Sequence, residues 1–187
     1  MGEPMCKNLL KANLPLTVWN RSIDKTHELK NLGAEVASSP HDAVKGADVI
    51  ITMLSDGAAV HDLIFKQNVA ENICNNATHI DMGSIGAHEA IEHSKKHIIK
   101  RINYLDAPVS GGTKGAEAGE LAIMVGGNEK SFLDMQDVFT PMGHSTFVGP
   151  NGCGQLAKLA NQVIVAITIG AISEALILAG KGGAAVS

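Results

Sequence analysis

The sequence predicts an α/β fold with a doubly wound, mostly parallel sheet. Short apolar runs alternate with helical stretches along the chain, which is the pattern of parallel strands joined by crossover helices. Hydrophobic residues make up 45% of the chain and aromatic residues only 3%, so the core must be aliphatic, as in parallel sheets. A length of 187 residues gives room for one such domain and a short additional element.

The expected elements follow one another in a regular order. Apolar runs of strand length lie at residues 16–20, 35–38, 49–54, 78–82, 103–109, 121–125 and 146–148. Helical stretches are expected at residues 5–12, 22–32, 40–45, 87–100, 129–139 and 155–179.

Composition excludes several functional classes. A formal net charge of −4 without a basic stripe argues against nucleic acid as a partner. Cys6, Cys74 and Cys153 are far apart, so neither a disulfide framework nor a zinc site is expected. The chain shows no secretory signal, and its longest apolar run, residues 163–172, is shorter than a membrane span. We expect a protein of the cytoplasm, with the mitochondrial matrix as the alternative, and no membrane partner.

Two segments near the start are candidates for binding a dinucleotide. Gly2 precedes an amphipathic helix, as the third glycine of a G-x-G-x-x-G loop does. The strand at residues 16–20 ends in Asn20, followed by Arg21 and Ser22, whereas in NAD enzymes that strand often ends in an acidic residue that binds the ribose. Arg and Ser donate hydrogen bonds to a 2′-phosphate, so NADP is favoured and NAD is the alternative. A polar turn with Ser22 as an N-cap is the structural alternative.

A run of small residues is a candidate anion site. Residues 106–112 read D-A-P-V-S-G-G, and consecutive small residues expose backbone N–H groups. The hydroxyl of Ser110 adds a donor beside Gly111 and Gly112. These groups are suited to a carboxylate, although a Gly-Gly pair is also common in plain turns.

A glycine-rich loop at residues 149–154 opens the last helix and is followed by Lys158. Asn161 and Gln162 lie three and four residues after Lys158, on the same helix face. Hydride reduction of an aldehyde creates an alkoxide, which a lysine ammonium can protonate while an amide orients the oxygen. Without the glycine-rich loop before it, a lysine on a helix would be interpreted as an exposed, solvated charge.

Taken together, these motifs resemble the β-hydroxyacid dehydrogenase family, whose members include 3-hydroxyisobutyrate dehydrogenases. M-G-x-P-M, D-A-P-V-S-G-G, M-V-G-G and G-x-G-x-x-x-K-L-A-N-Q occur in the order typical of that family. The run at residues 158–166 is most similar to the tartronate semialdehyde reductases. The resemblance implies a Rossmann-type domain and NAD(P)H-dependent interconversion of a small 3-hydroxy acid and its semialdehyde, of the tartronate semialdehyde, 3-hydroxyisobutyrate or succinic semialdehyde and glyoxylate type.

The resemblance also implies roles for individual residues. Lys158 would be the proton donor, and the substrate would be surrounded by Ser110, Gly111, Gly112, Asn161 and Gln162. The cofactor would lie near Gly2, Asn20, Arg21, Ser22, Met53, Leu54 and Ser84. Two positions depart from related patterns. Gly83 stands where the family commonly has Ser or Thr, and Asn161-Gln162 stands where 6-phosphogluconate dehydrogenases usually have His-Asn.

The two ends lead to a further expectation. A nucleotide-binding sheet has a central strand before its phosphate loop, and none precedes the helix at residues 5–12. We therefore expect residues 1–153 to form a dinucleotide-binding domain without its first strand, and residues 154–187 to form a long helix leading to an absent all-α domain. That helix is apolar on nearly all sides, which favours a homo-oligomer. The fragment is expected to be inactive, and the alternative is a non-catalytic remnant that binds a nucleotide or a protein.

One competing metal site was considered. Glu89, His93 and His97 are spaced four residues apart on one helix face. They lie among Glu92 and several lysines, which is typical of a solvated face, so we expect no metal.

Overall fold

Parallel strands form the centre of the molecule. The computed structural model describes residues 1–186, and its larger sheet has six strands. In spatial order these are β3 (Val49–Thr52), β4 (Thr78–Asp81), β5 (Asn103–Asp106), β7 (Leu121–Gly126) and β6 (Val109–Ser110), with β8 (Gly143–Gly149) also paired to β7. Pairing is parallel from β3 to β5 and between β7 and β8, and antiparallel for β5–β7 and β6–β7. The predicted α/β class with a mostly parallel sheet is confirmed.

A second, smaller sheet lies beside the first. It consists of β1 (Thr17–Val18) and β2 (Glu35–Val36), which pair in parallel. Within residues 1–186, neither strand pairs with β3, and no strand occupies the place between the two sheets. Val18 of β1 and Leu29 of the helical segment that follows it belong to a small separate cluster of buried apolar side chains.

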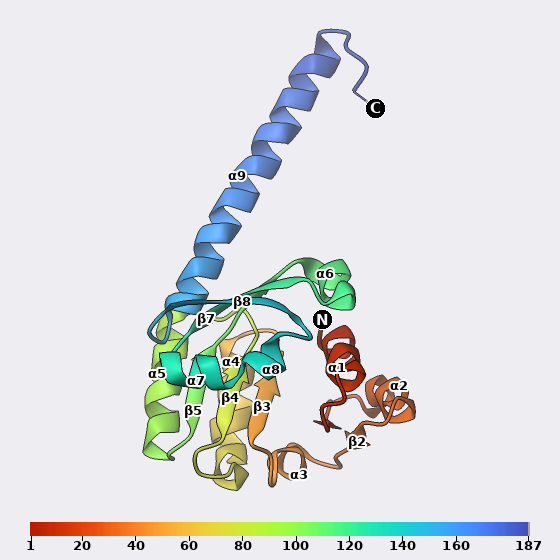
Figure 1. The fold of residues 1–187 in the computed structure, drawn as a ribbon. Helices are drawn as coiled ribbons and strands as arrows, with labels where there is room; N and C mark the ends of the chain where they lie inside the picture. Colours follow the sequence, from red (N-terminus) through yellow and green to blue (C-terminus); the bar gives the residue numbers. More distant parts are fainter. Residues whose placement is uncertain (187) are drawn as a thin grey trace.

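Helices flank both sheets (Figure 1). They are α1 (Gly2–Lys11), α2 (His27–Asn31), α3 (Pro40–Val44), α4 (Gly57–His61), α5 (Ala87–Ile99), α6 (Gly112–Ala118), α7 (Glu129–Asp134), α8 (Gln136–Phe139) and α9 (Cys153–Lys181). A 3-10 turn, Ile23–Thr26, precedes α2, and α4 continues into a π-helical turn, Asp62–Lys66.

The sequence analysis missed two helices and merged other elements. It did not predict α4, although Asp56 caps that helix by accepting a hydrogen bond from the Ala59 N–H at 2.8 Å. It also did not predict α6, which begins inside the Gly-Gly turn. The strand expected at residues 103–109 is divided into β5 and β6, because Pro108 has no N–H to continue the ladder.

The core is aliphatic, as the composition predicted. The main cluster includes the fully buried side chains of Ile80, Leu105 and Leu121, with Phe139 among the few aromatic members. A second cluster, which includes Val60 and Ile64, joins α4 and its extension to the sheet.

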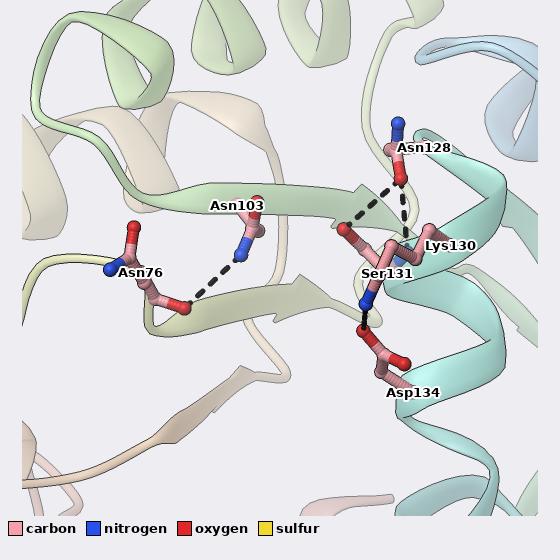
Figure 2. Close-up of polar contacts among 6 residues, drawn as sticks. All are labelled: Asn76, Asn103, Asn128, Lys130, Ser131 and Asp134. Carbon is pink, nitrogen blue, oxygen red and sulfur yellow. Dashed lines mark hydrogen bonds and ion pairs between the residues drawn. The ribbon is translucent and has the colours of Figure 1, made fainter.

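Polar side chains determine where some elements begin. Figure 2 shows Asn128, the residue after β7 and the loop glycine, accepting a hydrogen bond from the Ser131 N–H at 3.1 Å and thereby capping α7. In the same view, the Asn103 side chain donates to the Asn76 carbonyl at 3.1 Å and links the start of β5 to the loop before β4.

The last helix, α9, projects away from the rest of the molecule (Figure 1). It is 29 residues long, and by length and composition alone it could cross a membrane. The prediction that the apolar run is too short was therefore wrong, because the helix extends well beyond residues 163–172. Large apolar side chains such as Val163, Ile167 and Leu178 are exposed along it.

Candidate functional site

Two of the predicted substrate residues contact each other. Ser110 ends β6, and the Asn161 amide Nδ2 donates to its hydroxyl Oγ at 3.4 Å. Gly111 and Gly112 follow with φ values of +133° and +61°, so the chain turns there in a conformation that favours glycine. Gln162 lies next to Asn161 but is exposed, and its Oε1 is 3.4 Å from the Asn161 amide.

Lys158 lies one helical turn before Asn161 and is partly buried. Partial burial lowers the pKa of its ammonium group from the usual value. Among the described residues, no ion pair or side-chain hydrogen bond involves Lys158. Its protons are therefore free for a ligand.

Asp106 fixes the position of this helix. It ends β5, and its carboxylate accepts hydrogen bonds from the N–H of Gly152 at 2.8 Å and of Gln155 at 3.1 Å. Burial raises the pKa of Asp106, and these hydrogen bonds oppose that rise. Gly154 allows the close approach, since a Cβ there would lie 2.4 Å from the Asp106 carbonyl oxygen.

The predicted cofactor residues form two groups. In the first, a Cβ on Gly2 would lie 3.9 Å from Met53 Cβ, and a Cβ on Gly83 would lie 3.0 Å from the Leu54 carbonyl oxygen. The start of α1, the loop after β3 and the loop after β4 are thus adjacent. Ser84 is exposed in the last of these loops. Gly83 departs from the family pattern at a position where any side chain would crowd Leu54.

The second cofactor group lies after β1. Asn20 Oδ1 accepts from the Ser22 N–H at 2.9 Å, which forms a tight polar turn with Arg21 at its exposed tip. Ser22 is the N-cap residue of the following 3-10 turn, as the structural alternative expected, but its side chain makes no capping hydrogen bond. No side-chain hydrogen bond caps α1 either, so its first backbone N–H groups are free for a phosphate. These features fit a dinucleotide.

A buried chain of polar side chains joins α5 to strands β4 and β3. His97 Nδ1 donates to the His93 carbonyl at 2.7 Å, and His97 Nε2 lies 2.9 Å from His79 Nδ1. His79 Nε2 lies 2.9 Å from Thr52 Oγ1, which is 3.1 Å from Asp81 Oδ1. The interpretation of the α5 histidines as part of a solvated face was wrong, because His93 and His97 are buried.

Neither histidine belongs to a metal cluster in the part of the chain described by the structure, where no three His, Cys, Asp or Glu side chains could hold an ion. Glu89, the third residue considered, accepts from the Gly86 N–H at 2.8 Å. A hollow of about 320 Å³ lies between α4 and α5, lined by His61 and His93 among others, and none of the predicted site residues borders it.

The buried chain requires one proton more than its neutral histidines and threonine supply. Its four contacts need four hydrogens, and neutral His97, neutral His79 and the Thr52 hydroxyl provide three. Burial raises the pKa of Asp81 to about 6, and burial lowers the pKa of His97 to about 4. Asp81 is therefore the member of the chain that takes up a proton most readily as pH falls, and near neutral pH its carboxylate accepts from the Thr52 hydroxyl.

Comparisons with known proteins identify the family of the chain. Residues 1–149 match the family model described as the NAD binding domain of 6-phosphogluconate dehydrogenase. The chain is 40% identical to Escherichia coli (strain K12) 2-hydroxy-3-oxopropionate reductase, over 98% of this chain and 63% of that protein. It is 37% identical to an Arabidopsis thaliana protein, probable 3-hydroxyisobutyrate dehydrogenase-like 1, mitochondrial, over 98% of this chain and 55% of that protein.

A solved structure gives the same result. Mycobacterium tuberculosis 3-hydroxyisobutyrate dehydrogenase, determined with L-serine, superposes with a TM-score of 0.94 at 35% identity, over 99% of this chain and 63% of that one. The fold and the family match define an NAD(P)-binding domain of the kind found in oxidoreductases. The chain belongs to the β-hydroxyacid dehydrogenase family. It spans 55 to 63% of the length of these relatives.

Protonation of Asp81 predicts how stability depends on pH. The pKa of Asp81 is raised from 3.8 to about 6 in the fold, so its stabilising contribution is complete below 3.8 and is lost as pH rises through 6. The contribution of Asp81 to the free energy of unfolding should fall by about 3 kcal/mol in total over this pH range. Asp81→Asn keeps an acceptor for the Thr52 hydroxyl without a titrating group, so its free energy of unfolding should fall less over that range.

Urea unfolding at a series of pH values measures the difference between the two proteins. Glu117→Gln, on the exposed side of α6, is the matched control and should behave like the unmodified chain. Identical pH dependence in Asp81→Asn and the unmodified chain would show that the fold does not raise the pKa of Asp81.

Proposed function

We propose that these residues form the cofactor-binding and proton-donating part of an NAD(P)H-dependent oxidoreductase that interconverts a small 3-hydroxy acid and its semialdehyde. The observation that supports this most directly is the proximity of three groups. The Asn161 amide reaches the Ser110 hydroxyl, and Lys158 lies one turn before Asn161 with a lowered pKa. The Escherichia coli relative is a 2-hydroxy-3-oxopropionate reductase, which places a carboxylate-bearing aldehyde among the substrates to test.

The substrate carboxylate is suited to the turn after β6. Ser110 offers a hydroxyl, and the exposed glycines Gly111 and Gly112 offer backbone N–H groups. Asn161 is placed to orient the aldehyde oxygen, with Gln162 at the exposed rim. A small acid with its carbonyl one or two carbons from the carboxylate would satisfy both sets of donors.

Lys158 would hold and deliver the proton. Bound NAD(P)H supplies the hydride in this class of reaction. As negative charge develops on the substrate oxygen, the Lys158 ammonium donates a proton to it, and in the oxidation direction the neutral amine removes that proton. Burial makes the ammonium easier to deprotonate, so the same group serves both directions.

The cofactor would extend between the two groups of residues described above. Gly2 and the start of α1 would meet the phosphates, with Met53, Leu54 and Ser84 alongside. Asn20 would hold the turn that presents Arg21 and Ser22 to a ribose phosphate. The absence of an acidic residue in this turn favours NADP over NAD.

We also propose that the apolar surface of α9 is covered by protein, through self-association. The helix starts inside the site, and the alignment with each relative covers 98% of the chain, so α9 belongs to the enzyme fold rather than to an attached anchor. Glu174 lies within its apolar part. Charge at that position is costly in lipid and tolerated at a protein interface.

The overall proposal is tested by assaying reduction of tartronate semialdehyde, succinic semialdehyde and glyoxylate with NADPH and NADH. Turnover of any of these supports the enzyme. Tight binding of NADPH without turnover of any would favour the alternative, a nucleotide-binding protein that has lost catalysis.

Replacing the proposed proton donor should affect catalysis more than binding. Lys158→Ala should lower kcat by about 10²–10⁴-fold, the usual contribution of a general acid, with a nearly unchanged Kd for NADPH. Reduction requires the ammonium, so the rate should fall as pH rises through the Lys158 pKa, which lies below that of an ordinary lysine. Lys130→Ala, on exposed α7, is the control. A Lys158→Ala rate within a few-fold of the unmodified rate would assign the proton donor elsewhere.

Cofactor preference should depend on Arg21. NADPH should bind more tightly than NADH, and Arg21→Ala should weaken NADPH binding by about tenfold or more, because hydrogen bonds to charged groups contribute about 1.5–3 kcal/mol. NADH binding should change little. Fluorescence titration of both cofactors measures this, with Lys25→Ala as the control for a nearby lost charge. Equal affinities for NADPH and NADH would refute the preference.

A charge on α9 should reduce self-association. Ile169 is exposed on this helix, and Ile169→Asp should shift the chain toward monomer, since a buried unpaired charge is unfavourable at an interface. Sedimentation velocity measures the distribution, with Lys130→Asp as a control away from α9. An unmodified chain that is a monomer in aqueous buffer contradicts the proposal, and one that stays dispersed only in detergent would indicate a membrane partner.

A further inference from the structure

We propose that Gln155 is a positioning residue that joins the cofactor loop after β4 to the helix that carries Lys158. The inference rests on the proposed function and adds a residue to it. Gln155 lies in the first turn of α9 and is only 1% exposed. It is far from the loop in sequence but in direct contact with it.

Both ends of the Gln155 amide are used, and in opposite senses. Its Nε2 donates to the Gly83 carbonyl at 2.9 Å, and its Oε1 accepts from the Ile85 N–H at 3.1 Å. An amide satisfies both partners at once, whereas a carboxylate lacks the donor and a methionine of similar length lacks both. The loop has no regular secondary structure at these residues, so these two backbone groups depend on Gln155 for their partners.

The two bonds lie on either side of Ser84, the predicted cofactor contact. Gly83 is also held from the opposite direction, because its N–H donates to Asp81 Oδ1 at 3.2 Å. With the residues before and after it fixed by buried groups, Ser84 is left exposed. The direction in which Ser84 faces is thus determined by Gln155.

The backbone of Gln155 determines the position of Lys158, the proposed proton donor. Its backbone N–H donates to Asp106 Oδ2 at 3.1 Å, which fixes the first turn of α9 on the end of β5. Lys158 is three residues further, a rise of about 4.5 Å along the helix axis. Gln155 therefore sets the loop that would contact the reactive end of the cofactor against the lysine that would protonate the substrate.

If Gln155 only stabilised the fold, its replacement would weaken binding at both ends of the cofactor. If it positions the loop after β4, its replacement should weaken binding at the nicotinamide end alone. Arg21 lies in the turn after β1 of the smaller sheet, whereas the loop that Gln155 holds follows β4 of the larger sheet. Adenosine 2′,5′-bisphosphate carries the ribose phosphate but no nicotinamide, so it reports on the Arg21 end alone. A loss of fold would weaken its binding as well as that of NADPH.

The first experiment measures the Kd of NADPH and of adenosine 2′,5′-bisphosphate for the chain and for Gln155→Met. NADPH should bind about tenfold or more weakly to the variant, the order expected for lost buried hydrogen bonds, and the fragment should bind equally to both proteins. Gln67→Glu, an exposed substitution, is the control. Equal weakening of both ligands would assign Gln155 to the fold alone, and no change in either would remove it from the site.

The second experiment uses Gln155→Glu and pH. A protonated carboxylic acid has a donor and an acceptor, so it can replace the amide toward Gly83 and Ile85 at acidic pH, and ionisation removes the donor. NADPH affinity of this variant should approach that of the unmodified chain at acidic pH and fall as pH rises, relative to Gln155→Met. A pH response identical to that of Gln155→Met would overturn the inference.

Hydrogen exchange provides a measurement that needs no cofactor. The Ile85 amide should exchange faster with solvent in Gln155→Met than in the unmodified chain, while buried strand amides such as that of Ile80 stay protected. Unchanged exchange at Ile85 contradicts the inference. Failure of the unmodified chain to bind any NAD(P)H, with faster exchange at Ile85 in the variant, would instead refute the proposed function and leave the structural coupling in place.

Discussion

The site depends on a buried carboxylate at the end of a central strand. Asp106 ends β5 and accepts backbone hydrogen bonds from Gly152 and Gln155, so the first turn of α9 is fixed to the sheet. An unpaired buried carboxylate would be unfavourable, and free N–H groups at a helix start favour negative charge, so each stabilises the other. Since Lys158 and Asn161 follow on the same rigid helix, their positions relative to β6 derive from this contact.

Parallel strands explain why residues far apart in sequence meet at one edge. β3 and β4 run in the same direction, so the loops that follow them, at Leu54 and Gly83, come together at their carboxyl ends. Ser110 reaches the same region although β6 is antiparallel to its neighbour, because it lies at the end of β6 where Asn161 of α9 approaches. The aliphatic core behind these loops holds the strands, and the predicted site residues lie at or just after the strand ends.

Much of this could be predicted, and the exceptions have physical causes. Lys158, Asn161 and Ser110 were predicted because a glycine-rich loop before a helix and a run of small residues have local patterns, and the contact between Asn161 and Ser110 agrees with them. Gln155 was missed because its partners are 70 and 72 residues away, and no local pattern reports such a pairing. His97 was misjudged because its neighbours along α5 are charged, whereas its burial is set by the strands on which that face packs.

The loop around Gly83 shows why the site uses buried polar groups rather than an entirely apolar support. A loop without ladder partners must satisfy its backbone groups from side chains, or lose free energy comparable to a hydrogen bond for each buried orphan. Asp81 supplies the acceptor for the Gly83 N–H and Gln155 the donor for its carbonyl. A side chain at position 83 would crowd the Leu54 carbonyl, so glycine lets the loops after β3 and β4 come close together. The departure from the family pattern at Gly83 is thus compatible with a cofactor site, because both of its backbone groups remain bonded to buried side chains.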